Sequence, residues 1–267
     1  MIIHNFDPVI LDFGIVQIRW YSIAYLLGIF LGWIYIKKII LNFQKKNNFS
    51  SLTKKDFDDL IFYLVIGIIL GGRIGYVIFY NLEYYLKNFS EIFMIWNGGM
   101  SFHGGLIGVI IVSIIYGNIK KTNFLKITDI ISCAAPIGLF FGRIANFING
   151  ELYGKPSSLP WAVIFPNSGN MPRHPSQIYE ALLEGLLLFI IINLLALKGN
   201  KIFKIGFTSS FFLICYSIFR IIGEIFREPD YHIGYFLNFI SMGTILSIVA
   251  FVAGIFMLLQ IKKYEKL

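Results

Sequence analysis

Seven apolar segments, each long enough to cross a lipid bilayer, constrain the fold of this chain more than any other feature. They cover about residues 18–38, 57–80, 102–118, 125–147, 177–197, 205–226 and 236–261. A transmembrane helix needs about 20 mostly apolar residues, and a segment in lipid must satisfy its backbone hydrogen bonds internally. The pattern predicts an all-α polytopic membrane protein with about seven transmembrane helices. A glycine-rich stretch before Ile107 leaves open a re-entrant turn at the third segment.

The composition supports this prediction, because 57% of the residues are hydrophobic and 14% are charged, whereas soluble proteins carry about 25% charged residues. The first segment is too long for the apolar region of a signal peptide, so we expect it to be retained as a span. We expect residues 1–267 to form a single integral membrane domain. Within it, the proline-rich residues 151–176 would form a small extracytoplasmic loop or cap.

The distribution of lysine predicts how the chain is oriented. Lysines cluster at residues 37–55, 120–126, 198–204 and 262–266. Under seven spans all four clusters share one side, and the positive-inside rule makes that side the cytoplasm. The N-terminus is then extracytoplasmic and the C-terminus cytoplasmic. The net charge of +8 comes mostly from these cytoplasmic lysines, which need no partner beyond the anionic lipid of the membrane. Nothing in the sequence indicates a nucleic-acid partner.

No metal or cofactor site is evident in the sequence. Cys133 and Cys215 lie in separate apolar segments, so we interpret them as buried free thiols rather than as a disulfide or a metal site. The four histidines are dispersed, and their spacing does not suggest metal binding. We therefore expect no metal and no cofactor.

Residues 142–154 read GRIANFINGELYG and place several polar groups at the end of the fourth apolar segment. Arg143, Asn146 and Gly150 share one helix face, with Asn149 at its edge. A charged residue inside a span costs at least ~2.5–3.5 kcal/mol and usually faces a protein-lined or watery cavity. The alternative is purely structural, with the guanidinium bonding backbone carbonyls and the asparagines acting as caps. A guanidinium, two amides and a carboxylate together favour a ligand site.

Two more arginines lie in the outer parts of other spans. Arg73 follows glycines at four-residue spacing, which taken alone is typical of close helix packing. Arg220 and Glu224 are four residues apart, so they could form no more than an intrahelical ion pair. Three spans nevertheless contribute one arginine each, and arginine makes bidentate contacts with phosphate. We expect the three to converge on a phosphate-bearing ligand, for which a lipid headgroup is the source available at that depth.

His103 is the candidate general base. It lies in the glycine-rich stretch of residues 98–105, where small neighbours let a ligand approach closely. Histidine has an unperturbed pKa of about 6.5, which suits proton transfer near neutral pH. The alternative is an interfacial histidine with no catalytic role. Tyr25 lies one turn deeper in its span than Tyr21, and either belongs to an aromatic belt or directs its hydroxyl group toward the cavity.

The segment RHPSQIYE, residues 173–180, precedes the fifth apolar segment and reads as the start of a helix. Ser176 is a candidate N-cap, and Glu180 falls in the first turn. Glu184 lies one turn further along. These features are consistent with a purely structural role.

Five sequence blocks in order resemble the prolipoprotein diacylglyceryl transferase family of bacterial inner-membrane enzymes. The blocks are GGRIGY (71–76), GGMSFHGGLIG (98–108), GRIANFINGELYG (142–154), RHPSQIYE (173–180) and FRIIGEIFREPD (219–230). The resemblance implies transfer of the diacylglyceryl group of phosphatidylglycerol to the lipobox cysteine thiol of a preprolipoprotein, which forms a thioether and releases glycerol phosphate. It also implies a seven-span protein of the bacterial inner membrane with its active site toward the outer leaflet.

The resemblance also implies roles for individual residues. The family pattern places His103 as the base and Arg143 and Arg220 as phosphate ligands. Its essential site residues correspond to Tyr25, Asn146, Glu151, Gly154 and Glu224. On this view Glu151 and Glu224 hold the guanidiniums in register, while Asn146 and Tyr25 position the headgroup. To these we add four further candidate substrate-binding residues, Arg73, Tyr76, Gly98 and Gly104.

Other membrane proteins could also require charge inside the bilayer. A lipid transporter or scramblase with an arginine-lined headgroup site would predict a symmetric pair of broken helices, and the sequence shows no such repeat. An intramembrane serine protease would require a GxSG motif, which is absent. A metal-dependent phosphotransferase would require clustered aspartates, yet the chain has none between Asp59 and Asp129.

Overall fold

The computed structural model describes residues 2–14, 17–49, 52–166, 168–229, 235–236 and 240–264. Asp230, which ends the last sequence block, and His232 lie outside the described residues, as does Lys266 in the C-terminal lysine cluster. The chain forms two compact units, one of Met1–Phe43 with Asp129–Leu267 and one of Gln44–Thr128. Each unit is described by itself.

Six helices in the described part of the chain are long and apolar enough to cross a membrane. They are Trp20–Lys46, Lys54–Tyr80, Phe124–Ile148, Ser176–Lys198, Phe207–Phe226 and Met242–Ile261. The third predicted segment forms a shorter apolar helix, His103–Ile119. It is short because Gly98 and Gly99 adopt positive φ angles of 81°, which end any preceding helix, and because the hydroxyl of Ser101 caps the new one. The prediction of an all-α polytopic membrane protein is confirmed.

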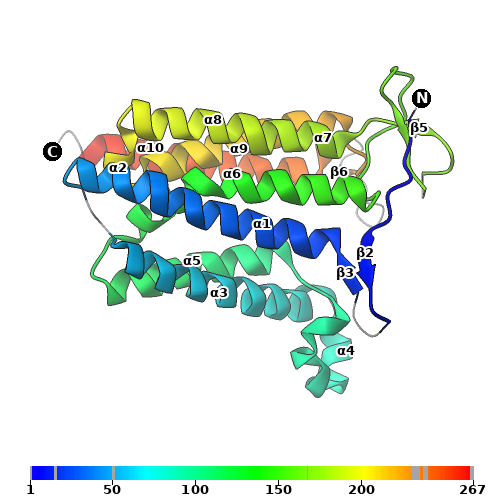
Figure 1. Ribbon diagram of the computed structural model, residues 1–267, viewed down its shortest axis with the longest axis horizontal. Helices are drawn as coiled ribbons and strands as arrows, with labels where there is room; N and C mark the ends of the chain where they lie inside the picture. The colour runs from blue at the N-terminus through cyan, green and yellow to red at the C-terminus, as the bar shows by residue number, and fades with distance from the viewer. Residues whose placement is uncertain are drawn as a thin grey trace. The chain divides into compact units, whose positions relative to one another are not determined.

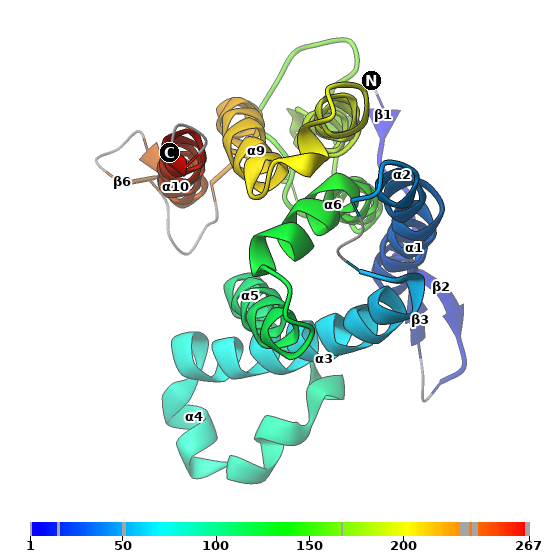
Figure 2. The same ribbon diagram turned by 90° about the vertical axis from the view of Figure 1, so that its left-hand side faces the viewer.

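Five of the long helices lie wholly or largely in the larger unit, and Figure 1 shows them side by side. In chain order its elements are β1 (Ile2–Ile3), β2 (Val9–Asp12), β3 (Gln17–Arg19), α1 (Trp20–Tyr35), the π-helix Ile36–Ile40, α2 (Leu41–Lys46), α6 (Phe124–Ile148), β4 (Val163–Ile164), β5 (Pro172–Arg173), α7 (Ser176–Glu180), the π-helix Ala181–Leu187, α8 (Leu188–Asn193), the π-helix Leu194–Lys198, the 3-10 helix Lys201–Phe203, α9 (Phe207–Phe226), β6 (Tyr235–Phe236), β7 (Ile240–Ser241) and α10 (Met242–Tyr264). Helix α9 packs between α10 and the α7–α8 run (Figure 2).

Small residues and one buried carboxylate fix the helices of the larger unit. Helices α1 and α6 approach so closely at Gly28 that a Cβ atom there would lie 2.9 Å from the Cα atom of Gly138. At the other end, Asp129 in α6 is 1% exposed and caps the start of α9. Its carboxylate accepts hydrogen bonds from the backbone N–H of Gly206 at 2.6 Å and from the backbone N–H and hydroxyl of Ser209, each at 2.8 Å.

The described residues of the proline-rich region predicted as a cap form no long helix and include two short strands. Strand β4 pairs in parallel with β1 and antiparallel with β5, which gives a three-stranded sheet in the order β1-β4-β5. The backbone of Gly154 also forms an isolated antiparallel bridge with Arg227 at the end of α9. The cap is therefore joined by backbone pairing to the N-terminal strand β1 and to the end of α9.

The smaller unit is built on two helices that meet through glycine. It contains α3 (Lys54–Tyr80), α4 (Leu82–Lys87), the 3-10 helices Phe89–Phe93 and Ile95–Asn97, and α5 (Phe102–Ile119). A Cβ atom at Gly104 would lie 2.2 Å from the carbonyl oxygen of Gly71, and one at Gly108 would lie 2.0 Å from that of Gly67. The recurring glycines of α3 thus serve close helix packing, which was the simpler interpretation of their spacing.

Candidate active site

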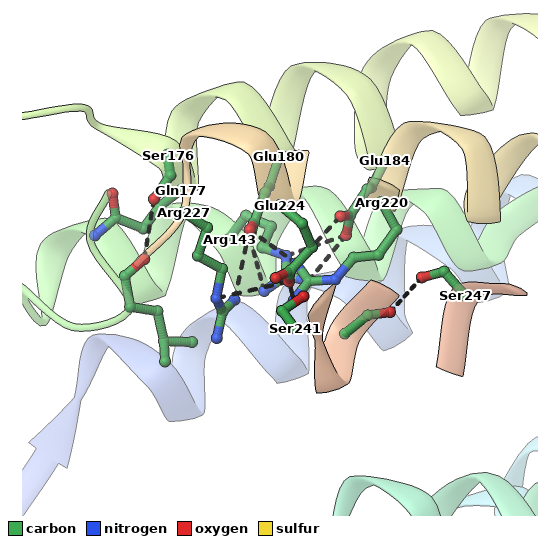
Figure 3. A network of polar contacts seen from close by, with 12 residues as sticks. Arg143, Ser176, Gln177, Glu180, Glu184, Arg220, Glu224, Arg227, Ser241 and Ser247 are labelled. Carbon is green, nitrogen blue, oxygen red and sulfur yellow. Dashed lines mark hydrogen bonds and ion pairs between the residues drawn. The ribbon is translucent and has the colours of Figure 1, made fainter. Parts of the chain in front are cut away.

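Six charged side chains gather inside the larger unit, contributed by α6, α7, the following π-helix, α9 and the C-cap residue of α9 (Figure 3). They are Arg143, Glu180, Glu184, Arg220, Glu224 and Arg227. Three guanidiniums face three carboxylates, so the formal charges of the cluster cancel. Glu180 and Glu184 have no exposed side-chain surface, and the other side chains are 6–16% exposed. Burial of so many charges is tolerable only because each one is paired.

Arg143 is held by both glutamates of the α7 run. Its Nε and Nη2 atoms donate to Oε2 of Glu184 at 3.2 and 2.9 Å. Its Nη1 atom lies 2.9 Å from Oε2 of Glu180. The guanidinium plane is therefore fixed by partners on another helix, and 16% of the side chain remains accessible.

Arg220 meets the same two glutamates from α9. Its Nη1 atom donates to Oε1 of Glu180 at 2.8 Å and to Oε1 of Glu184 at 3.4 Å. Its Nη2 atom pairs with Glu224 one turn along the helix. The predicted intrahelical ion pair is thus present, but it is one part of a larger network. Arg227 extends the network, because its Nη1 atom donates to Oε1 of Glu180 at 3.4 Å.

Asn146 and Glu151 interact with each other beside this cluster. The Nδ2 atom of Asn146 donates to Oε1 of Glu151 at 2.7 Å and to the hydroxyl of Tyr21 at 3.3 Å. The ring of Tyr25 lies 5.1 Å from that of Tyr21, measured between centroids. The contact shown for Glu151 is with an amide, so the carboxylates that position the guanidiniums are Glu180, Glu184 and Glu224.

Gly154 lies where the cap meets the end of α9. Its N–H donates to the carbonyl of His174 at 2.9 Å, and a Cβ atom would lie 2.6 Å from both the Cβ atom of His174 and the carbonyl oxygen of Phe226. A side chain does not fit there, which gives the glycine a packing role next to Arg227. Partial burial, with a smaller effect from Lys155, lowers the pKa of His174 below its ordinary value.

The role expected for Ser176 is wrong. The N-cap of α7 is Pro175, and Ser176 is already the first helical residue. Its hydroxyl donates instead to the carbonyl of Leu152 at 3.1 Å, and Gln177 donates to the carbonyl of Glu151 at 2.6 Å. Fixed φ makes proline a suitable residue at the start of a helix, and the serine is used to hold the cap.

Arg73 in the smaller unit is 4% exposed and surrounded by backbone. Its guanidinium donates to the carbonyls of residues 91, 92, 94, 98 and 99 at 2.5–3.3 Å. These five bonds match the five N–H donors of an arginine. The guanidinium therefore fastens the turn between α4 and α5, a function that sequence patterns do not reveal because its acceptors are backbone atoms.

The remaining candidates of the smaller unit shape the same turn. Gly98 has a positive φ angle, and the ring of Tyr76 lies so close to Gly99 that a Cβ atom there would be 2.4 Å from it. Gly104 lies in the contact between α3 and α5 described above. His103 is in the first turn of α5 and is exposed. The turn thus leads directly to the candidate base.

Sequence reasoning did not predict that Glu180, Glu184 and Arg227 pair within the charged cluster. A signal was available, because two glutamates one turn apart in an otherwise apolar span require buried cationic partners. Their position near the start of a helix explained the same pattern without a site, however. No group of three or more histidine, cysteine, aspartate or glutamate side chains that could hold a metal ion occurs among the described residues.

The fold and the charged cluster define a polytopic membrane protein with a buried, charge-balanced arginine and glutamate site. The sequence model of the Prolipoprotein diacylglyceryl transferase family matches residues 8–260. Proteins named phosphatidylglycerol–prolipoprotein diacylglyceryl transferase are similar over nearly the whole chain. The protein of Rickettsia felis is 49% identical over 96% of this chain and 97% of its own length. That of Rickettsia canadensis is 50% identical over 95% of this chain and 96% of its own. This chain belongs to the prolipoprotein diacylglyceryl transferase family.

Proposed function

We propose that this protein is a phosphatidylglycerol–prolipoprotein diacylglyceryl transferase. It transfers the diacylglyceryl group of phosphatidylglycerol to the lipobox cysteine of a preprolipoprotein. The observation that carries the proposal is the pair of buried guanidiniums, Arg143 and Arg220, fixed by glutamates in a chain that matches this family over residues 8–260. Such a pair suits a lipid phosphate, because fixed cations in a low-dielectric site stabilise developing negative charge strongly.

The reaction replaces a carbon–oxygen bond by a carbon–sulfur bond. His103 takes the proton of the cysteine thiol, and the thiolate attacks the glycerol methylene carbon that carries the phosphate. The bond from that carbon to the phosphate oxygen breaks, and glycerol phosphate leaves with the electron pair. Arg143 and Arg220 stabilise its charge, and the proton held by His103 is returned to the leaving group or to water.

Other residues position the substrate or the side chains that bind it. Tyr25 and Asn146 position the headgroup, and Glu151 orients Asn146 through the 2.7 Å hydrogen bond. Glu224 orients Arg220, and Gly154 admits the close packing of the cap beside Arg227. For Arg73, Tyr76, Gly98 and Gly104 the contacts favour a supporting role through the turn that leads to His103.

We further propose a location for the reaction. The whole chain acts as a single integral membrane domain of the bacterial inner membrane, with residues 151–176 as an extracytoplasmic cap. Its N-terminus is extracytoplasmic, its C-terminus is cytoplasmic and its active site faces the outer leaflet. The lysine clusters support this orientation. Phosphatidylglycerol and the signal-peptide and lipobox segment of the preprolipoprotein both arrive from the membrane.

The test uses purified protein in detergent, phosphatidylglycerol labelled in its headgroup, and a lipobox peptide. A matched peptide with serine in place of cysteine is the control. We expect the cysteine peptide alone to gain the mass of a diacylglyceryl group, with release of an equal amount of labelled glycerol phosphate. Folded protein that moves phosphatidylglycerol between vesicles but leaves the peptide unmodified would support the transporter alternative instead.

A further inference from the structure

We infer that Glu180 and Glu184 are positioning residues for the reaction, which act on the lipid phosphate through Arg143 and Arg220. This inference rests on the proposed function and deepens it. The two glutamates belong to one helical run, and the two arginines come from two other helices, α6 and α9 (Figure 3).

Each glutamate bridges both arginines, using one oxygen for each. Glu180 places Oε2 at 2.9 Å from Arg143 and Oε1 at 2.8 Å from Arg220. Glu184 places Oε2 at 2.9 Å from Arg143 and Oε1 at 3.4 Å from Arg220. Two carboxylates one turn apart therefore hold two guanidiniums in a fixed mutual orientation. This is what a phosphate ester needs from a pair of arginines, because bidentate contacts depend on geometry as well as on charge.

A π-helix and two glycines allow the helix that carries the glutamates to approach the helices that carry the arginines. The segment that carries Glu184 is the π-helix Ala181–Leu187, a form of helix that often occurs at functional sites. Gly223 faces the glutamates from α9, and a Cβ atom there would lie 3.2 Å from the Cγ atom of Glu180. Toward α6, a Cβ atom at Gly185 would lie 2.6 Å from the Cβ atom of Phe140. Small residues thus let the glutamate helix approach both arginine helices.

Burial excludes the two glutamates from direct contact with the substrate. Both side chains are 0% exposed, whereas Arg143 and Arg220 are 16% and 11% exposed. A ligand that enters the cluster from outside can therefore reach the guanidiniums but not the carboxylates behind them. The glutamates act only through the arginines.

Charge explains why two buried glutamates are needed. Two guanidiniums next to each other in a low-dielectric site repel, and two carboxylates cancel that repulsion. The complete cluster is neutral, so orientation rather than net positive charge has to favour the phosphate. Removing one carboxylate charge should therefore leave ground-state attraction for an anionic lipid intact or stronger, while the guanidiniums lose their alignment with the leaving group. The expected signature is a fall in kcat without a rise in KM.

The experiment compares Glu180→Gln and Glu184→Gln with the control Glu228→Gln. Glu228 follows Arg227 in the chain, and its side chain also pairs with an arginine, Arg173 at 3.0 Å. That carboxylate is 43% exposed, however, and it pairs with none of the six cluster side chains among the described residues. We expect each cluster variant to lose at least tenfold in kcat per folded molecule, with KM for phosphatidylglycerol unchanged or lower. The control should keep wild-type values.

Four results separate the possibilities. If the glutamates served only stability, the folded fraction would fall while kcat per folded molecule stayed normal, and the inference would be overturned. A rise in KM at unchanged kcat would also overturn it. If a glutamine variant does not fold, Glu184→Asp keeps the charge but withdraws the carboxylate by one methylene, and normal kcat in that variant would refute positioning. Wild-type protein that transfers nothing would refute the proposed function instead.

Discussion

Replacement of Gly108 by alanine tests the packing that holds the helix of the candidate base. A Cβ atom at this position would lie 2.0 Å from the carbonyl oxygen of Gly67 and 2.7 Å from its carbonyl carbon. These are backbone atoms of another helix, so no side-chain rotation relieves the clash. To reach ordinary contact at 3.4 Å, α3 and α5 must separate by roughly 1.4 Å.

The size of the effect follows from two opposing terms. Overpacking of a tight contact costs about 1–3 kcal/mol, and alanine recovers up to ~1 kcal/mol over glycine within a helix. Because the obstacle is backbone, we expect the upper end of the cost and a net loss of about 2 kcal/mol. At ~2–4 °C per kcal/mol for a chain of this size, the Tm of Gly108→Ala in detergent should fall by roughly 4–8 °C.

Gly105→Ala is the matched control on the same helix. A Cβ atom there would meet the carbonyl oxygen and Cγ2 atom of Ile68 at 3.6 and 3.7 Å, which is ordinary contact, so its Tm should be unchanged or slightly higher. Thermal unfolding of the two variants side by side would measure the difference. Equal Tm values for Gly105→Ala and Gly108→Ala would refute the close approach of α3 and α5.

Three further predictions concern the larger unit. Arg143→Lys keeps the charge but loses the two hydrogen bonds to Glu184, so transfer should fall roughly 10²–10³-fold in protein that still inserts; near-normal turnover would count against a bidentate phosphate contact. Asp129→Asn weakens the buried cap of α9 and should cost about 1–2 kcal/mol of stability, visible as a lower Tm with normal kcat per folded molecule; an unchanged Tm would contradict this. Cys133→Ala and Cys215→Ala should both transfer normally, and loss of activity in either folded variant would point to a covalent cysteine mechanism.

The helices of this protein could be predicted because lipid allows so few alternatives. The segment predicted at 205–226 is α9, Phe207–Phe226, since only a helix satisfies the backbone within an apolar run. The convergence of Arg143 and Arg220 could also be predicted, because a charged side chain inside a span is costly unless it has a partner. Their shared partners could not be predicted, since Glu180 fits a helix start equally well.

Other contacts had no sequence signal. The acceptors of Arg73 are carbonyl groups, which every residue carries. The contact of Glu151 with Asn146 follows a turn at Gly150, whose φ angle is 66°. The direction of a side chain after such a turn depends on tertiary structure rather than on spacing.

In the proposed mechanism, thiol activation by His103 and phosphate stabilisation by the buried arginines together bring about transfer of the diacylglyceryl group. The most direct test measures transfer from labelled phosphatidylglycerol to a lipobox peptide by wild-type protein and by His103→Gln, normalised to folded protein. We predict that the wild type modifies the cysteine and releases glycerol phosphate, and that folded His103→Gln does neither. Transfer by His103→Gln at the wild-type rate would contradict this assignment and direct attention to Tyr25 as the base.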